Sequence, residues 1–260
     1  IDLTTLSAAQ GFIIQGDEEG DSAGRSVSWA GDVNGDGYDD LIVGAPYGDD
    51  GGPSAGETYV VFGSASGFGS DVGGRQVIDL TSLSAAQGFI IQGDSSIDMS
   101  GLRVSSAGDV NGDGLDDLLV GAPSGDDGGG RAGEAYVVFG SISGFGNDVS
   151  GRQVIDLSSL TAAQGFIIQG DAAFDRAGAS VSSADINGDG YDDLIVGAPS
   201  GDDGGIYAGE TYVVYGTASG FGGADGSGRQ VVDLSALAPS QGFIIQGDAE
   251  FDNAGYSVSS

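Results

Sequence analysis

The sequence contains no cysteine and no histidine, and Met99 is the only methionine among 260 residues. Without cysteine no disulfide can stabilise the fold, although the lack of cysteine does not indicate in which cellular compartment the protein lies. Without histidine and cysteine, any bound metal must be held by oxygen atoms, which favours a hard cation. Since the first residue is Ile1, we expect a processed product or a fragment of a longer translated protein.

Positive charge is also scarce, with 7 Lys and Arg against 39 Asp and Glu and a formal net charge of −32. Nucleic acids and anionic membranes attract clustered basic residues, so this composition excludes nucleic acid as a partner. No apolar run approaches the roughly 18 residues that suggest a membrane span, and no membrane insertion is expected. Apolar residues still make up 39% of the chain, in short runs between glycines, which indicates a folded protein. Repulsion among the carboxylates would weaken that fold unless cations neutralise some of them.

A repeat of 77 residues runs through the whole chain. The string GFIIQGD begins at Gly11, Gly88, Gly165 and Gly242. We therefore interpret residues 1–260 as a single repeat array. Its units are residues 1–77, 78–154, 155–231 and a partial unit 232–260.

Each unit contains four short strand signals bounded by glycine or turn clusters. In the first copy they cover residues 25–30, 41–43 and 58–62, and the fourth covers residues 89–92 of the next unit. The first signal alternates polar and apolar residues, whereas the others are continuous apolar runs, as expected for strands covered on both faces. Residues 81–87 predict one capped helical turn before the fourth strand.

Four strands per unit predict an all-β fold made of β-propeller blades of four antiparallel strands. We expect three complete blades plus a partial terminal blade, with a leading fourth-type strand at residues 12–15 and a trailing first-type strand at residues 256–259. A β-solenoid is the alternative, but its turns usually take only about 20 to 30 residues. Closing a propeller takes typically four to eight blades, so we expect either a longer array or several associating copies.

A nine-residue loop joins the first and second strands of each blade, reading DVNGDGYDD, DVNGDGLDD and DINGDGYDD. Oxygens at positions 1, 3 and 5 converge in a tight turn that glycine at position 6 permits. Position 7 offers a backbone carbonyl, and the aspartate at position 9 supplies the last ligand. This oxygen-rich set predicts one calcium ion per loop and suits magnesium less well. The alternative is a solvated loop of Asx turns without metal, which three repetitions at one spacing make unattractive. The candidate ligands are Asp32, Asn34, Asp36, Tyr38 and Asp40; Asp109, Asn111, Asp113, Leu115 and Asp117; and Asp185, Asn187, Asp189, Tyr191 and Asp193.

The succession of an SVS strand, a GDVNGDG loop, a DLIVGAP strand and a YVVFG strand resembles the FG-GAP repeat of integrin α-subunits and of many bacterial surface proteins. The likeness covers every unit, with Gly-Ala-Pro at 44–46, 121–123 and 197–199. One departure is that Ala23-Gly24 stands where the family has Phe-Gly. The resemblance implies seven-bladed propellers whose calcium loops lie on the face away from the ligand, and therefore a structural role for the metal.

A second acidic set recurs in each unit. Asp17, Asp94, Asp171 and Asp248 are each followed four residues later by Asp21, Asp98, Asp175 and Asp252. Propeller topology places this set beside the GDDGG loops and beside Glu57, Glu134 and Glu210, on the face opposite the nine-residue loops. The pattern predicts either a second cation site or a solvated rim.

Catalysis is not expected. Every acidic residue recurs with the same neighbours, whereas an acid and a base need different environments, and no nucleophile–base pair is visible. The sequence predicts a secreted, extracellular or cell-surface calcium-binding module with a structural or adhesive role, whose partner is a protein or a glycan. The alternatives are an architectural fibre or surface-layer subunit that self-associates into an oligomer, and a non-catalytic part of a secreted hydrolase.

Overall fold

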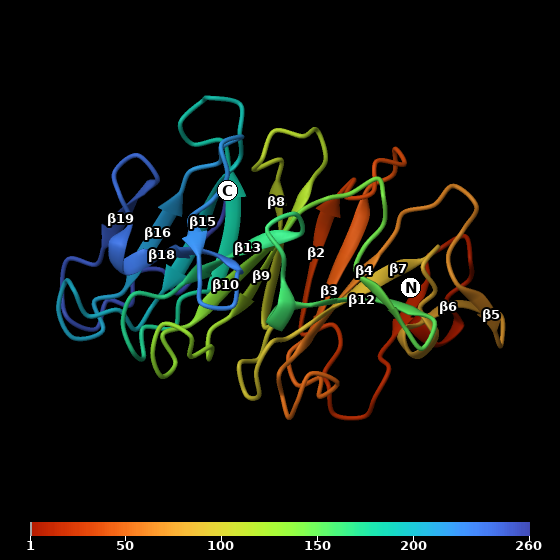
Figure 1. Ribbon diagram of the computed structural model, residues 1–260. Helices are drawn as coiled ribbons and strands as arrows, with labels where there is room; N and C mark the ends of the chain where they lie inside the picture. The colour runs from red at the N-terminus through yellow and green to blue at the C-terminus, as the bar shows by residue number, and fades with distance from the viewer. Residues whose placement is uncertain (1) are drawn as a thin grey trace.

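Short apolar runs between glycine-rich turns form β-sheets in the computed structural model of the chain, which describes residues 2–260. The sheets follow one another in chain order, from the N-terminal sheet on the right of Figure 1 to the sheet that contains β19 on the left. The chain is therefore all-β and consists of propeller blades in a row. Within the described residues there is no helix long and apolar enough to cross a membrane.

The first blade pairs its strands in the antiparallel order β2–β3–β4–β7. These strands are β2 (Ser26–Gly31), β3 (Asp40–Ala45), β4 (Glu57–Val61) and β7 (Gly88–Gln92). All five residues of β4 are buried, as a strand covered on both faces requires. The four strand predictions are confirmed, and β3 extends beyond the predicted segment at both ends.

The second and third blades repeat this arrangement. Their strands are β8 (Arg103–Gly108), β9 (Asp117–Ala122), β10 (Glu134–Val138) and β13 (Gly165–Gln169), then β14 (Ser180–Ala184), β15 (Asp193–Ala198), β16 (Glu210–Val214) and β19 (Gly242–Gln246). The first strands β2, β8 and β14 pack side by side from one blade to the next. Val104 N donates to Ser26 Oγ at 3.2 Å across this contact, and Ser183 Oγ donates to Ser106 O at 3.1 Å.

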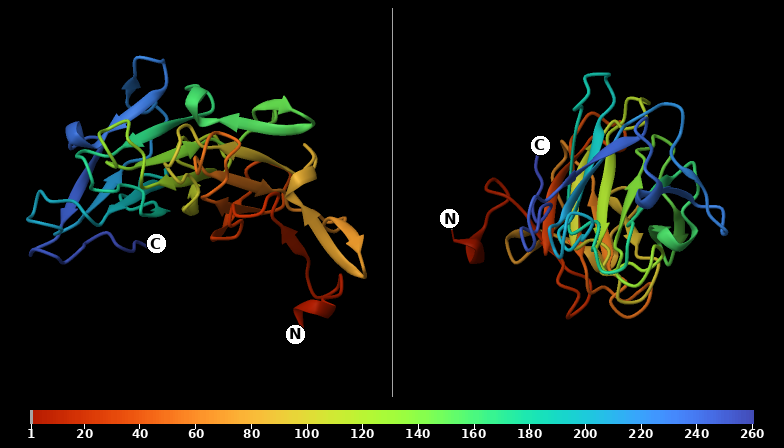
Figure 2. Two further views of the ribbon diagram at one scale, coloured as in Figure 1. Left: turned by 90° about the horizontal axis from the view of Figure 1, so that it is seen from below. Right: turned by 90° about the vertical axis from the view of Figure 1, so that its left-hand side faces the viewer.

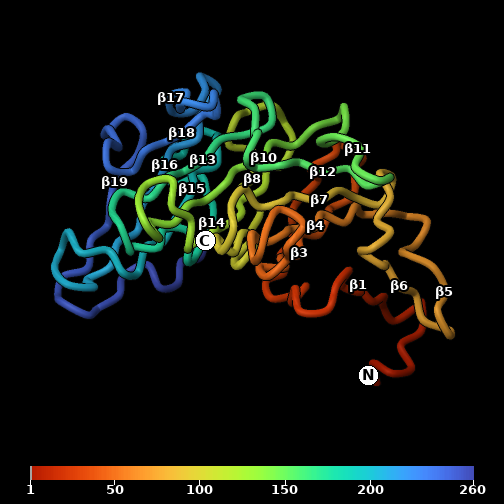
Figure 3. Tube along the Cα trace, turned by 60° about the horizontal axis from the view of Figure 1, so that its bottom comes forward, coloured from red at the N-terminus to blue at the C-terminus, as the bar shows by residue number. Residues whose placement is uncertain are grey.

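A β-hairpin that the sequence analysis missed lies between the third and fourth strands of each unit. It extends the sheet of the preceding blade, since β12 pairs in parallel with β7 and β18 with β13 (Figure 3). The hairpins are β5 (Ser70–Val72) with β6 (Arg75–Asp79), β11 (Asn147–Val149) with β12 (Arg152–Asp156), and β17 (Gly223–Ala224) with β18 (Gln230–Asp233). Figure 2 shows the β5–β6 hairpin projecting at the N-terminal end of the row.

The turn of the first hairpin carries the signal that predicts it. Gly73 and Gly74 both have positive φ, +63° and +86°, which is the conformation of a two-residue type I′ turn. Ser150 and Gly151 also have positive φ in the second hairpin. A Gly-Gly pair flanked by Val72 and Arg75 is a recognised hairpin signature.

The capped helical turn predicted at 81–87 is present as a shorter 3₁₀ turn, η2 (Leu80–Ser82). Its N-cap is Asp79, whose side chain accepts a hydrogen bond from Thr81 N at 3.1 Å. The same turn recurs as η1 (Leu3–Thr5), η3 (Leu157–Ser159) and η4 (Leu234–Ala236).

The hydrophobic core lies between neighbouring blades. One cluster joins Ile42 and Val60 of the first blade to Val120 and Tyr136 of the second, and all four side chains are fully buried. Burying a side chain of this size contributes roughly 1.5 to 3 kcal/mol. Each blade therefore depends on its neighbour for much of its buried apolar surface.

The terminal strand predictions had different outcomes. The leading strand is present as β1 (Ile13–Gln15), which pairs in parallel with β6. The trailing strand predicted at 256–259 is wrong, because the structure has no strand there. A first strand pairs with the second strand that follows it, as β2 does with β3, and no such strand follows residue 259 in this sequence.

Candidate metal-binding sites

The nine-residue loop between β2 and β3 curls around its own acidic side chains. Asp32 Oδ1 accepts hydrogen bonds from Gly35 N at 2.9 Å and Asp36 N at 3.1 Å, and its Oδ2 accepts from Gly37 N at 2.9 Å. Asn34 Oδ1 accepts from Asp36 N at 2.8 Å, and Asp36 Oδ1 from Tyr38 N at 3.0 Å. The same bonds form in the other two loops.

The donor chemistry of this turn fits calcium. Positions 1, 3 and 5 bring two carboxylates and an amide oxygen to one exposed turn. Asp32 Oδ2, Asn34 Oδ1 and Asp36 Oδ1 each accept one backbone hydrogen bond and keep a second lone pair. Gly37 at position 6 has a φ of +89°, a conformation that favours glycine and that the turn requires. A hard cation takes oxygen ligands of this kind. Asp32, Asn34 and Asp36 are the side chains that would hold it.

Position 9 has a role in the fold that the sequence analysis did not assign. Asp40 is fully buried, its Oδ2 accepts from Val33 N at 3.1 Å, and its Oδ1 accepts from Gly63 N at 2.8 Å. Asp117 and Asp193 make the equivalent bonds. Burial raises the pKa of Asp40 to about 6 and that of Asp117 to about 8. This side chain ties the loop to the end of the third strand.

Position 8 connects the loops of neighbouring blades, and sequence reasoning missed it. Asp116 Oδ2 accepts from Asp32 N at 2.9 Å, and Asp192 Oδ2 accepts from Asp109 N at 3.0 Å. The approach is so close that a Cβ at Gly31 would lie 2.2 Å from the Asp116 carboxylate. The recurring Asp-Asp pair at positions 8 and 9 was the available signal.

The second acidic set forms a buried cluster in each blade, at the far end of the strands from the nine-residue loops. β3 begins at the nine-residue loop and ends at Ala45, which pairs with Glu57, so Glu57 lies at the end of the blade away from that loop. In each cluster one oxygen from each of three carboxylates lies within 4.8 Å of the others. The clusters are Asp17, Asp21 and Glu57; Asp94, Asp98 and Glu134; and Asp171, Asp175 and Glu210.

Burial separates these clusters from the neighbouring GDDGG loops. Asp98 is 3% exposed and Glu134 1% exposed, whereas Asp126 and Asp127 are exposed. The predicted neighbourhood of the second acidic set and the glutamates is confirmed. The solvated-rim alternative is correct for the GDDGG aspartates and wrong for the three clusters. Asp248 and Asp252 of the fourth copy are exposed.

An arginine from the following hairpin reaches each of the first two clusters. Arg152 Nη2 lies 2.9 Å from Asp50 Oδ2, and its Nη1 lies 3.4 Å from Asp17 Oδ2. Sequence analysis had not singled out either arginine. The GRQV string at the end of each hairpin turn was the signal that could have found them.

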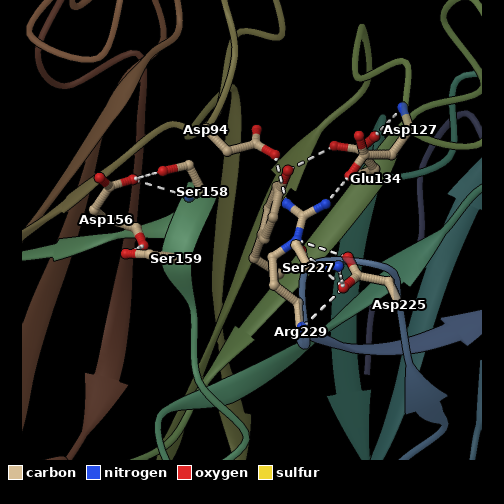
Figure 4. A network of polar contacts seen from close by, with 10 residues as sticks. Asp94, Asp127, Glu134, Asp156, Ser158, Ser159, Asp225, Ser227 and Arg229 are labelled. Atoms are coloured by element: carbon tan, nitrogen blue, oxygen red, sulfur yellow. Dashed lines mark hydrogen bonds and ion pairs between the residues drawn. The ribbon is translucent and has the colours of Figure 1, made fainter.

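In the second cluster the guanidinium of Arg229 lies among Asp94, Asp127 and Asp225 (Figure 4). Its Nη1 is 3.0 Å from Asp94 Oδ2, and its Nε is 2.9 Å from Asp225 Oδ2. The Arg229–Asp94 pair is largely buried, because only 13% of the Arg229 side chain and 6% of the Asp94 side chain are exposed.

Hydrogen bonds hold the glutamate of this cluster in place. Glu134 Oε1 accepts from Asp127 N at 2.8 Å, and Oε2 accepts from Tyr136 Oη at 2.6 Å. Burial, followed by the charge of Glu134, raises the pKa of Asp98 to about 8. Burial likewise raises the pKa of Glu134 to about 7. Without a bound cation, Asp98 is therefore mostly protonated at neutral pH and Glu134 is only partly ionised.

Comparisons with known proteins agree with the repeat structure. The family model described as FG-GAP repeat matches residues 23–61, 101–138 and 177–215. Phosphatidylinositol-glycan-specific phospholipase D of Bos taurus is 30% identical over 237 residues, which cover 89% of this chain and 24% of that protein. Integrin alpha ina-1 of Caenorhabditis elegans is 34% identical over 206 residues, which cover 73% of this chain and 16% of that protein. Human integrin alpha-8 is 29% identical over 239 residues, which cover 90% of this chain and 19% of that protein. The chain spans about a quarter or less of the length of these relatives.

Proposed function

The chain belongs to the FG-GAP repeat family, and we propose that it is an extracellular propeller module whose blades are stabilised by calcium in the nine-residue loops. The observation that carries this proposal is the threefold recurrence of Asp, Asn and Asp oxygens on one exposed turn. The hydrogen bonds of each turn arrange these oxygens before an ion arrives. The calcium would be structural, because the loop also contacts the neighbouring blade.

The position of Asp116 supports this structural role. Its carboxylate accepts from the backbone of Asp32, the first residue of the preceding loop, so an ion that orders one loop also orders the contact between blades. Binding to the native state alone stabilises it by about 4 kcal/mol when free ion exceeds the dissociation constant a thousandfold. We expect chelator to lower the melting temperature of the chain.

The test is a calcium titration of chelator-treated protein, with binding and melting temperature measured together. One ion per nine-residue loop is expected, and Asp36→Asn, Asp113→Asn and Asp189→Asn should each remove one. Matched variants at exposed GDDGG aspartates, such as Asp126→Asn, remove the same charge outside the loops. Melting that is identical with and without calcium would overturn the proposal.

The role of the module is structural or adhesive, with a protein or a glycan as partner. Similarity to integrin α chains supports an adhesive role. Similarity to a phospholipase D supports the second candidate, a non-catalytic part of a secreted hydrolase, since the matched region is only 24% of that enzyme. The chain itself supplies neither histidine nor cysteine, and its carboxylates recur with the same neighbours in every blade. On either reading we expect no hydrolysis by this chain alone.

A further inference from the structure

Each buried acidic cluster gathers more negative charge than its protein neighbours can balance. In the second cluster, Asp94, Asp98 and Glu134 each place an oxygen within 4.8 Å of the others, and among residues 2–260 Arg229 supplies the one positive charge paired there. Asp127 adds a further carboxylate beside that arginine. Buried carboxylates need compensating charge, because removing them from water is costly.

The hydrogen bonds of the second cluster leave one oxygen without a partner. Both oxygens of Glu134 accept hydrogen bonds, and Asp94 Oδ2 is paired with Arg229. Asp94 Oδ1 is buried and has no hydrogen-bond partner among the described residues, and only 6% of the Asp94 side chain is exposed. An ionised carboxylate only accepts, so a buried oxygen of this kind requires a donor or a cation.

The same unpartnered oxygen recurs in the third cluster. Asp171 Oδ1 is buried without a partner, beside Asp175 at 3% exposure and Glu210 at 0%. Within residues 2–260, no arginine forms an ion pair with this cluster. The three carboxylates therefore converge whether or not an arginine is present, and the arginine is not what gathers them.

The spacing fits one hard cation. Calcium binds oxygen at about 2.3 to 2.6 Å, so oxygens on one ion lie within about 5 Å of one another. The cluster oxygens lie within 4.8 Å. Three carboxylates and no nitrogen or sulfur ligand favour calcium or another hard divalent ion over zinc or copper.

We propose that Asp94, Asp98 and Glu134, and the equivalent residues of the other blades, form a second divalent-cation site, at the end of the blade opposite the nine-residue loop. The unpartnered oxygens of Asp94 and Asp171 would gain the cation as their partner. In the first two blades the arginine of the following hairpin closes over the site, so the ion and the arginine together hold one blade against the next.

The test is equilibrium dialysis of the full chain against calcium alone, with bound metal measured by mass spectrometry. We expect more bound ions than there are nine-residue loops. Asp98→Asn should lose one ion and keep those of the loops, whereas Asp113→Asn should lose one loop ion and keep those of the clusters. The control Asp126→Asn removes an exposed carboxylate of the same blade and should lose none.

Each outcome decides between the two kinds of site. If Asp98→Asn binds as many ions as the unmodified chain while Asp113→Asn binds fewer, protons and arginine neutralise the cluster and the second site is overturned. If only Asp98→Asn binds fewer, the cluster stands and the loop proposal fails. Asp175→Asn repeats the test in the third blade, where no arginine pair is disturbed, and far-UV circular dichroism checks that each variant is folded.

Discussion

Arg229 Nη1 lies 3.0 Å from Asp94 Oδ2, although 135 residues separate them in the sequence. The same hairpin pairs β18 with β13 and stacks Phe221 on Phe166, with ring centroids 4.0 Å apart. One hairpin thus binds the preceding blade through backbone, aromatic and ionic contacts. The first hairpin of the chain pairs and stacks in the same way, but Arg75 makes no ion pair among residues 2–260.

Replacing Arg229 by glutamine should destabilise the chain by roughly 3 kcal/mol, because it leaves buried Asp94 without its cationic partner. The matched control is Arg75→Gln, at the same position of the first hairpin, which should cost less than about 1 kcal/mol. Urea unfolding of both variants in the same buffer measures the difference. Equal losses would mean that the ion pair contributes nothing beyond the arginine stem.

Phe145→Ala should remove the aromatic contact between the second hairpin and the first blade. Phe145 is 7% exposed and stacks on Phe89 with centroids 3.9 Å apart, so we expect a loss of about 3 to 5 kcal/mol. Phe68→Ala, where the partner Phe12 is only partly buried, should cost clearly less. Thermal melting of both variants provides the comparison, and a smaller loss for Phe145→Ala would contradict it.

Gly31→Ala should disrupt the contact between neighbouring loops. The position has a φ of +76°, and a Cβ there would meet the Asp116 carboxylate. Gly67→Ala is the control, since Gly67 has a φ of +97° with nothing within 4 Å. Backbone strain of about 1 kcal/mol is common to both, so the excess loss in Gly31→Ala measures the clash. The prediction fails if the two variants unfold at the same urea concentration.

Asp113→Ala should be more damaging than Asp126→Ala in saturating calcium. Asp113 is a proposed ligand at position 5 of the second loop, and its side chain also accepts from Leu115 N. Asp126 is exposed, and substitutions at such sites usually stay within about 0.5 kcal/mol. Calcium stoichiometry and melting temperature are measured for both. A larger loss for Asp126→Ala would overturn the assignment of the loop as the structural site.

Without calcium, the chain should lose stability as pH rises from about 4 to about 8. Burial raises the pKa of Asp117 to about 8 and that of Glu57 to about 7 in the folded state, whereas an unfolded Asp or Glu titrates near 4. A raised folded pKa gives stability that is present below the unfolded pKa and is lost as pH rises through the folded value. Melting in chelator at pH 5 and pH 8 tests the sign, and calcium should reduce the difference because it binds the ionised carboxylates. Higher stability at pH 8 in chelator would contradict the prediction.

The sequence by itself determined the local elements. A constant spacing of 77 residues, the glycine at position 6 and the short apolar runs between turns specify blades and loops through interactions among near neighbours. The Gly73-Gly74 pair specified the hairpin just as clearly, although the prediction of four strands per unit did not include it.

Only the tertiary structure decided which distant residues meet. Asp40 is buried and accepts from the amides of Val33 and Gly63, and Asp98 is buried while Asp126 of the same blade is exposed. The Arg229–Asp94 pair joins a hairpin to the preceding blade across 135 residues of sequence. Periodicity fixes what each unit contains, but every unit carries the same acidic residues, so no local pattern tells which of them is buried. Burial depends on the packing of one blade against the next, and that packing converts a repeated acidic pattern into exposed loops at one end and buried clusters at the other.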